Sequence, residues 1–187
     1  MKSILLSMLL LSCMLTTKAQ LTVLSENFTA CSGSAPAGWT AYNVSGTEVW
    51  TCTSSGFSGN GIQISGYNGG SNYANEDWLI TPVCDFNAMH HPVLSFQSHT
   101  NYTGQALDVF VSTNYTSSTS PATATWIPLT PSLPYASSNT WYLSDGTDLT
   151  PYKNQPLHIA FRYQSTNTAA STWKLDDIQV KEEPLLL

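Results

Sequence analysis

The chain has 187 residues and is acidic: twelve Asp and Glu stand against six Lys and Arg, a formal net charge of −6 at pH 7. Nucleic acids and anionic membrane surfaces are bound by clustered Lys and Arg, and the sequence holds no such cluster, so both classes of partner are excluded. Roughly 168 residues follow the N-terminal apolar segment, which is enough for a single domain with its own core.

The N-terminus is predicted to be a signal peptide. An apolar run over residues 4–15 is too short to span a bilayer, and small residues at Thr17 and Ala19 suit cleavage after Ala19. A second interpretation treats the sequence up to Cys13 as a lipoprotein signal, in which Cys13 would carry a lipid anchor. Both interpretations place the protein outside the cytoplasm, secreted or at the cell surface. We divide the chain into a signal peptide (1–19), one domain (20–183) and a tail (184–187), with no membrane span.

The rest of the chain is predicted to be β-structure. It shows short runs of β-branched and aromatic residues separated by Gly, Pro, Ser, Thr and Asn, and no sustained 3.6-residue apolar period. Apolar and polar residues alternate within these runs, so each strand offers one face to a core. We predict an all-β fold, a two-sheet antiparallel jelly-roll β-sandwich with almost no helix. The predicted strands span residues 21–28, 39–43, 49–53, 61–65, 77–81, 93–98, 107–112, 125–129, 140–144, 157–164 and 172–180.

Three cysteines follow the signal peptide, and in an oxidising compartment one pair and one free thiol are expected. Cys31 and Cys52 flank a polar segment, and a disulfide between them would close a loop of about 22 residues, worth roughly 3 kcal/mol. Cys84 follows a predicted strand and is expected to be a buried free thiol. A zinc site of Cys84, His90 and His91 is the alternative, but its spacing matches no zinc-finger pattern.

The last predicted strand contains two adjacent aspartates, Asp176 and Asp177. Buried carboxylates are costly unless they are neutralised, and few Lys or Arg are present to do so, which makes a hard metal ion such as calcium the candidate partner. The alternative is a solvent-exposed pair at the end of a strand. Simple alternation also puts the apolar residues before and after this pair on opposite faces, so a bulge near the aspartates is needed to bring all of them into one core. These apolar residues are Trp173, Leu175, Ile178 and Val180.

Six phrases, taken in order, resemble one known family. They are Glu26-Asn27-Phe28, Pro36-Ala37-Gly38-Trp39, Val49-Trp50-Thr51-Cys52, Glu76-Asp77-Trp78-Leu79-Ile80-Thr81-Pro82, Leu107-Asp108-Val109-Phe110-Val111-Ser112-Thr113 and Trp173-Lys174-Leu175-Asp176-Asp177-Ile178. From about residue 21 to 181 the chain resembles a choice-of-anchor J or cleaved-adhesin domain of secreted Bacteroidetes-type proteins.

The resemblance implies a jelly roll related to carbohydrate-binding modules and to the adhesin domains of secreted gingipain proteases. It also implies a structural calcium ion shared by the first and last strands, which are expected to be neighbours. The ligands carried over to this sequence are Glu26, Asp176 and Asp177. The family often has a second acidic residue where this chain has Thr29, so one ligand is missing from the pattern.

An enzyme is not expected. Glu76-Asp77 and Asp176-Asp177 could supply the two carboxylates of a glycoside hydrolase, the less favoured alternative, but adjacent side chains on a strand point apart. The sequence contains no Gly-x-Ser-x-Gly elbow for a serine nucleophile.

We predict instead a monomeric, secreted binding module that recognises glycan on extracellular or host surfaces. Tyrosines in polar loops suit this role, because they join a flat apolar ring to a polar tip. The alternative is a protein–protein adhesin that binds no sugar. Most tryptophans lie in strand patterns and are assigned to the core: Trp39, Trp50, Trp78 and Trp173. The predicted ligand contacts are Tyr67, Asn68, Tyr73, Tyr102 and Tyr115.

Overall fold

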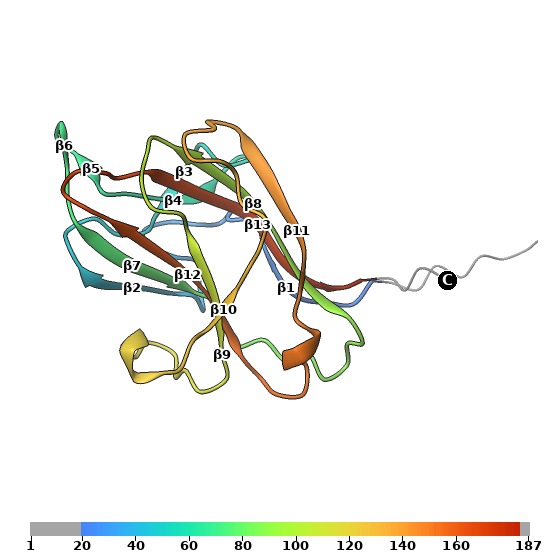
Figure 1. Cartoon of the computed structure of the whole chain (residues 1–187). Coiled ribbons are helices and arrows are strands. Elements are labelled where there is room, and N and C mark those ends of the chain that lie inside the picture. Colours follow the sequence, from blue (N-terminus) through green and yellow to red (C-terminus); the bar gives the residue numbers. More distant parts are fainter. Residues whose placement is uncertain (1–19, 184–187) are drawn as a thin grey trace, which may run out of the picture.

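The computed structural model describes residues 20–183, so the predicted signal peptide, the lipid site at Cys13 and the tail at 184–187 lie outside the described residues. Two antiparallel sheets form the domain (Figure 1). The six-stranded sheet has the order β11 (Trp141–Asp148), β8 (Pro92–Asn101), β13 (Thr172–Glu182), β4 (Gly61–Ser65) and β3 (Thr51–Thr53), and β1 (Thr22–Glu26) also pairs with β13.

The five-stranded sheet has the order β10 (Ile127–Leu129), β9 (Asp108–Ser112), β12 (His158–Ser165), β7 (Asn75–Ile80) and β2 (Thr40–Ser45). The predicted two-sheet antiparallel β-sandwich is therefore confirmed, and each predicted strand overlaps an observed one. Within the described residues, helix is limited to two short 3-10 turns, η1 (Pro121–Thr123) and η2 (Thr150–Tyr152). No helix within residues 20–183 is long and apolar enough to cross a membrane.

One small hairpin was missed by the sequence prediction. It consists of β5 (Tyr67–Asn68) and β6 (Ser71–Asn72), inside a segment expected to be a loop. Gly69 and Gly70 form its turn with φ values of 56° and 90°, a backbone conformation that glycine adopts without strain. The strands are polar and only two residues long, so no apolar alternation marks them in the sequence.

The core lies between the sheets, and its buried strand residues come from β1, β4, β7, β8, β9, β12 and β13. Along β12, Ile159, Phe161 and Tyr163 are fully buried in this core. Phe161 meets Phe96 of β8 edge to face, with ring centroids 5.2 Å apart, and so joins the two sheets. Each such buried aromatic or aliphatic side chain contributes about 1.5–3 kcal/mol relative to exposure.

The last strand contains the bulge that its sequence predicted. The register of β13 against β8 shifts between Asp176 and Gln179, and Asp177 adopts a φ of 46°. As a result the apolar residues on both sides of the aspartates face one core, each at most 2% exposed: Trp173, Leu175, Ile178 and Val180. The first and last strands are neighbours, as expected, with Glu26 opposite Ile178.

A second apolar cluster covers the outer face of the five-stranded sheet. The connection between β9 and β10 folds back over this face, and its Tyr115 and Trp126 pack with Trp78 and Ile80 of β7. Trp78 is buried, as predicted, but in this second cluster, on the face of its strand opposite the main core. The alternation of residues along a strand shows which side chains share a face. It does not show that a loop distant in sequence covers the second face of the sheet.

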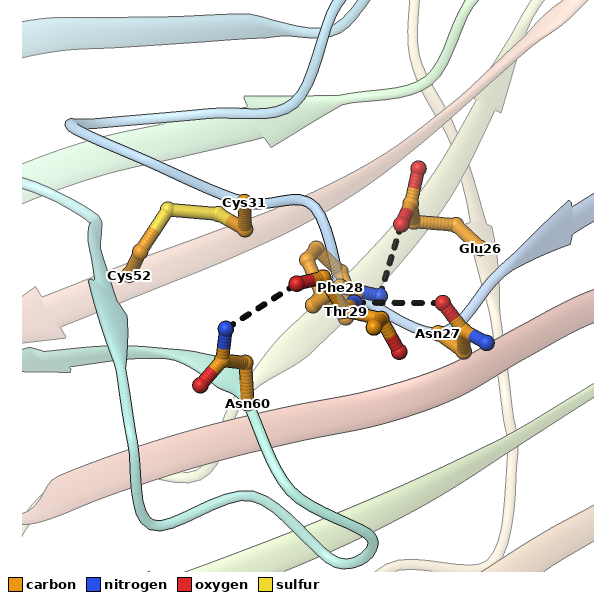
Figure 2. Close-up of a disulfide and its surroundings, with 7 residues drawn as sticks. All are labelled: Glu26, Asn27, Phe28, Thr29, Cys31, Cys52 and Asn60. Atoms are coloured by element: carbon orange, nitrogen blue, oxygen red, sulfur yellow. Dashed lines mark hydrogen bonds between the residues drawn. A yellow bond between two sulfur atoms is a disulfide. The ribbon is translucent and has the colours of Figure 1, made fainter.

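Cys31 and Cys52 form a disulfide with a Cα–Cα distance of 5.8 Å, which is the predicted pair, and Cys84 is free and buried. The disulfide ties the turn after β1 to the edge strand β3 (Figure 2). Beside it, the Asn60 side-chain amide donates to the Thr29 carbonyl at 3.1 Å. Burial raises the pKa of the Cys84 thiol to about 11, so this thiol is poorly reactive.

We expect the double substitution of Cys31→Ser and Cys52→Ser to lower the free energy of unfolding by about 3 kcal/mol, since it removes the closure of a loop from the unfolded chain. Urea denaturation monitored by tryptophan fluorescence measures this loss. Reduction of the wild-type protein should reproduce it, whereas Cys84→Ala, which breaks no covalent bond, is the control for the loss of a sulfur atom. A double variant as stable as the wild type would contradict the expectation.

Candidate functional site

Two exposed tyrosines meet at one end of the sandwich. Tyr67 lies on β5 and Tyr102 directly follows β8, and their rings stack with centroids 6.4 Å apart and an interplanar angle of 30°. Tyr67 is 51% exposed and Tyr102 60% exposed, although large aromatic side chains are usually buried. The pair therefore presents aromatic surface to solvent at a fixed position, 35 residues apart in sequence.

A groove of about 380 Å³ runs past these rings. The segment between β12 and β13 forms its other wall through Thr168, Ala169 and Ala170. Polar groups are contributed by Asn72 of β6 and by Thr103. Such a combination of apolar walls and a few polar side chains is typical of small-ligand sites, and the volume falls within their usual range.

The walls of the groove are anchored to the core by one hydroxyl group. Tyr163 of β12 is fully buried, and its Oη accepts a hydrogen bond from the Gly66 amide at 2.7 Å and donates to the Ser171 carbonyl at 2.8 Å. Gly66 begins the hairpin that carries Tyr67, and Ser171 ends the opposite wall. Gly104 packs so closely against Ser171 that a Cβ atom there would clash with its backbone amide. The groove is thus formed before any ligand arrives.

The other predicted contact residues lie elsewhere. Asn68 is exposed and donates to Glu48 Oε1 at 2.9 Å, and Tyr73 is exposed but is not among the residues that line the groove. Tyr115 is a correction: it is only 7% exposed, because its ring packs against Trp126 and His158 at centroid distances of 5.3 and 5.1 Å. No pattern in the sequence points to the wall from Thr168 to Ala170, which only the tertiary structure brings to the tyrosines.

The buried carboxylate of Asp176 is neutralised by backbone amides. Its Oδ2 accepts from the amides of Phe57 at 2.8 Å and Ser58 at 3.1 Å, and its Oδ1 accepts from Asp177 at 2.8 Å. Asp176 is 0% exposed, and burial raises its pKa above the usual range despite these donors. The carboxylate therefore holds the loop between β3 and β4 onto the bulge, and the three amide donors offset part of the cost of its burial.

Glu26 has a similar local role. Its Oε1 accepts from the Phe28 amide at 2.6 Å, closing the turn that follows β1 (Figure 2). Within residues 20–183 no group of three or more His, Cys, Asp or Glu side chains could hold a metal ion, and neither the predicted calcium ligands nor the alternative zinc ligands form such a group. Glu26, Asp176 and Asp177 therefore form no three-carboxylate group in the described part of the chain, and calcium binding stays a prediction for experiment.

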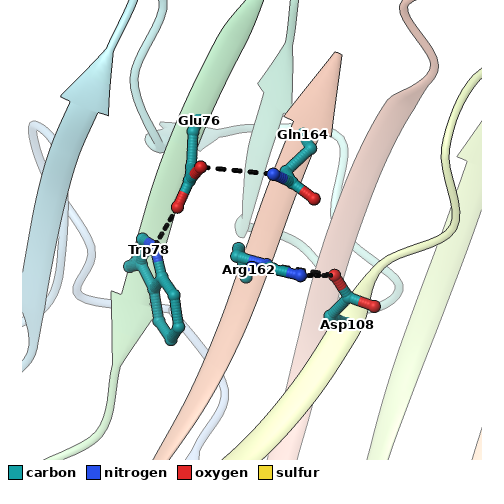
Figure 3. A network of polar contacts seen from close by, with 5 residues as sticks. All are labelled: Glu76, Trp78, Asp108, Arg162 and Gln164. Carbon is teal, nitrogen blue, oxygen red and sulfur yellow. Dashed lines mark hydrogen bonds and ion pairs between the residues drawn. The ribbon is translucent and has the colours of Figure 1, made fainter. Parts of the chain in front are cut away.

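The carboxylates of Glu76 and Asp77 lie on opposite faces of β7. Glu76 faces outward, where its Oε1 accepts from the Trp78 indole at 2.9 Å and its Oε2 from Gln164 at 3.2 Å (Figure 3). Asp77 is buried on the core side and accepts a hydrogen bond from the Asn75 side chain. Burial raises the pKa of Asp77 to about 7. The two groups do not share a reaction centre, because the sheet lies between them.

The model of one protein family matches residues 40–183. The chain belongs to the family described as Domain of unknown function (DUF5017). A search of curated proteins finds no match to the sequence. The structure of this DUF5017 domain is similar to the K3 cleaved-adhesin domain of Lys-gingipain from Porphyromonas gingivalis, with a TM-score of 0.60 and 17% identity over 88% of this chain and 100% of that one.

Two further structures share the fold. The K1 cleaved-adhesin domain of the same gingipain has a TM-score of 0.60 and 18% identity, over 86% of this chain and 98% of that one. A family 11 carbohydrate-binding module from Clostridium thermocellum, in complex with a β-1,3-1,4-mixed-linked tetrasaccharide, has a TM-score of 0.50 and 12% identity, over 84% and 95%. The predicted likeness to cleaved-adhesin domains is confirmed for the fold, whereas the choice-of-anchor J part of the resemblance stays a prediction.

We expect Asp176→Asn to lower the free energy of unfolding by about 2–3 kcal/mol, because an amide group cannot replace both acceptor oxygens of a charge-assisted cradle. The loss should be the same in calcium and in chelator if the amides alone neutralise the carboxylate. Urea denaturation under the two conditions measures it, with the exposed Asp85→Asn as a matched control.

Bound calcium would produce a different result. A ligand that binds only the folded state adds about 2.7 kcal/mol at a hundredfold excess over its Kd, so calcium would raise the melting temperature of the wild type. Asp177→Ala would remove that increase and leave the fold intact. Equal melting temperatures in calcium and chelator would end the calcium prediction.

We expect Asp77 to make the protein less stable as the pH rises from about 4 to about 7. In this window the native state keeps a proton on Asp77, with a pKa of about 7, that the unfolded chain releases near its ordinary value of 3.8. Once Asp77 is ionised in both states, above about pH 7, its contribution to the free energy of unfolding no longer changes with pH. Asp77→Asn mimics the protonated form, so the variant should gain stability relative to the wild type as the pH rises. A stability difference that is constant between about pH 5 and 8 would refute the shifted pKa.

Proposed function

We propose that the domain is a non-catalytic binding module that recognises glycan through the groove beside Tyr67 and Tyr102. The observation that carries this proposal is the stacked pair of exposed tyrosine rings along a groove of about 380 Å³. Pyranose rings have apolar C–H faces that pack on aromatic rings, and their hydroxyl groups need nearby amide and hydroxyl partners. Asn72, Thr103 and Thr168 supply these partners.

The rigidity of the groove also supports binding. Its two walls are linked through the Tyr163 hydroxyl, and the turn at Thr166 is closed by a hydrogen bond of 2.9 Å from the Thr166 amide to the Ala169 carbonyl. A preformed site loses little conformational entropy when a ligand binds. The similarity of the fold to adhesin domains and carbohydrate-binding modules agrees with a binding role.

An extracellular location fits the chemistry of the domain. The Cys31–Cys52 disulfide is the kind of cross-link that persists in oxidising compartments. The predicted signal peptide would deliver the chain there, where glycan on extracellular or host surfaces is within reach.

Protein adhesion without sugar binding is the second candidate, and one observation favours it. The edge of the six-stranded sheet near β11 exposes Tyr142 and Leu143, and Tyr135 in the preceding loop is 90% exposed. Exposed apolar side chains gathered on one edge are typical of protein contacts. This surface is separate from the groove beside Tyr67, so the two functions can be tested apart.

We expect Tyr67→Ala and Tyr102→Ala each to weaken glycan binding about tenfold, which corresponds to roughly 1.4 kcal/mol of lost stacking. Both side chains are exposed, so the melting temperature should hardly change. A glycan array with the folded domain, followed by titration calorimetry on the best ligand, measures the effect.

Tyr135→Ala is the control, since it removes a still more exposed tyrosine outside the groove. If only Tyr135→Ala abolishes attachment to cell-surface proteins while no glycan binds, the adhesin alternative replaces the proposal. Unchanged glycan affinity in both groove variants would remove the groove from the binding mechanism.

A further inference from the structure

A second groove lies on the outer face of the five-stranded sheet, under the connection between β9 and β10. It has a volume of about 290 Å³. Trp78 and Phe110 belong to the sheet, and Ala122 and Trp126 come from the covering connection. None of these residues lines the tyrosine groove, so the two sites can bind independently.

Three aromatic rings support this groove. Trp78 and Phe110, on β7 and β9, stack with centroids 5.5 Å apart and an interplanar angle of 25°. Trp126 packs on Trp78 at 5.1 Å. Aromatic side chains are therefore collected on the outside of the sandwich, where packing between the two sheets does not require them.

Arg162 lies against two of these aromatic rings in a fixed orientation. Its guanidinium carbon is 5.6 Å from the centroid of Trp78 and 5.1 Å from that of Phe110. Asp108 holds the group at one side, since its Oδ2 accepts from Nε at 3.0 Å and from Nη2 at 2.6 Å (Figure 3). The guanidinium is thereby a preoriented hydrogen-bond donor, partly exposed to solvent.

Glu76 is a fixed acceptor that lines the same groove. The Trp78 indole and Gln164 each occupy one of its oxygens with a single hydrogen bond, and Figure 3 shows this network and the Arg162–Asp108 pair side by side on the sheet. A carboxylate oxygen can accept more than one hydrogen bond, so Glu76 keeps acceptor capacity. The groove combines a donor, an acceptor and aromatic surface, all held in place before a ligand binds.

We propose that this groove is a second binding site, for a neutral polysaccharide. Sugar hydroxyl groups both donate and accept, which matches Glu76 and Arg162. The apolar C–H groups of a pyranose match the apolar part of the lining at Pro121, Ala122 and Ala124. An anionic ligand would meet the carboxylates of Glu76 and Asp108. A cationic ligand would meet Arg162, which already lies over the two ring faces that a cation prefers. A neutral ligand avoids both repulsions, so the charged residues of the groove favour it.

The test is native affinity electrophoresis of the whole domain in gels that contain mixed-linked β-glucan, xylan or galactan, with anionic polygalacturonate for comparison. Ala122→Arg places a long cationic side chain at the groove, where Glu76 attracts it, and leaves the Arg162 network intact. Thr125→Arg is the matched control, because Thr125 is exposed, lies outside the groove lining and receives the same charge. Tyr67→Ala with Tyr102→Ala tests the first groove in parallel.

We expect the wild type to be retarded by at least one neutral polysaccharide and not by polygalacturonate. Ala122→Arg should bind at least tenfold more weakly, and Thr125→Arg as the wild type does. The same ligand should shift the tryptophan emission of the wild type, since Trp78 and Trp126 line this groove and no tryptophan lines the other. The shift should be lost in Ala122→Arg.

Wild-type affinity of Ala122→Arg for every neutral polysaccharide overturns the inference, and so does a wild type that none of them retards. If only the double tyrosine variant loses binding, the tyrosine groove stands and the second site is refuted. If only Ala122→Arg loses binding, the second site stands and the function proposed for the tyrosine groove fails.

Discussion

The bulge at Asp176 and Asp177 is the constraint on which the rest of the sandwich depends. β13 pairs with β8 along its whole length, but on its other edge it pairs with β4 through residues 172–175 and with β1 through residues 178–181. The bulge lies between these two partners. The extra residue of the bulge reverses which alternate side chains face inward, so that both halves of the strand direct apolar side chains into the same core. Without it, one half of a central strand would place its apolar face in solvent.

The same bulge buries a carboxylate, which needs hydrogen-bond donors from a neighbouring loop. A carboxylate at position 176 is buried, and the loop between β3 and β4 supplies two amides to it. Gly56 is needed in this loop, because a Cβ atom there would lie 2.7 Å from the Asp176 carboxylate. The register of β13 therefore determines the position of Asp176, and Asp176 in turn determines the course of residues 54–60. Phe57 of this loop in turn packs its ring against Trp141 of β11, at a centroid distance of 5.9 Å.

Two neighbouring residues of β12 serve the two grooves. Tyr163 points into the core and joins the walls of the tyrosine groove, whereas Arg162 points outward and lies over the aromatic rings of the sheet face. Because successive side chains of a strand alternate between its faces, one strand can organise two sites without coupling them directly. β12 pairs with β7 and β9 on its two sides, which makes it a rigid support for both.

The sequence predicted what depends on local alternation and missed what depends on distant partners. The strand at 61–65 and the bulge near Asp176 follow from the spacing of apolar residues, and both are observed. Tyr67 and Tyr102 could be selected as exposed loop residues, but their stacking could not be predicted, because 35 residues separate them. Tyr115 could not be told apart from them, since only its contact with Trp126 reveals that it is buried. The cost of burying Asp176 was recognised, whereas its backbone partners lie 118 and 119 residues away in the chain.

The shortage of cations explains how the carboxylates of this chain are used. Twelve acidic residues share six Lys and Arg, so at least half of the carboxylates have no basic side chain of their own to pair with. Many accept hydrogen bonds from backbone amides instead: Glu26 closes the turn after β1, and Glu182 accepts from the amides of His90 and His91 at 2.8 and 2.9 Å. Such bonds fix turns at the ends of strands and require no second charged side chain. The only arginine of the sequence takes no part in these turns; it lies beside the aromatic rings of the outer groove, where Asp108 fixes its orientation.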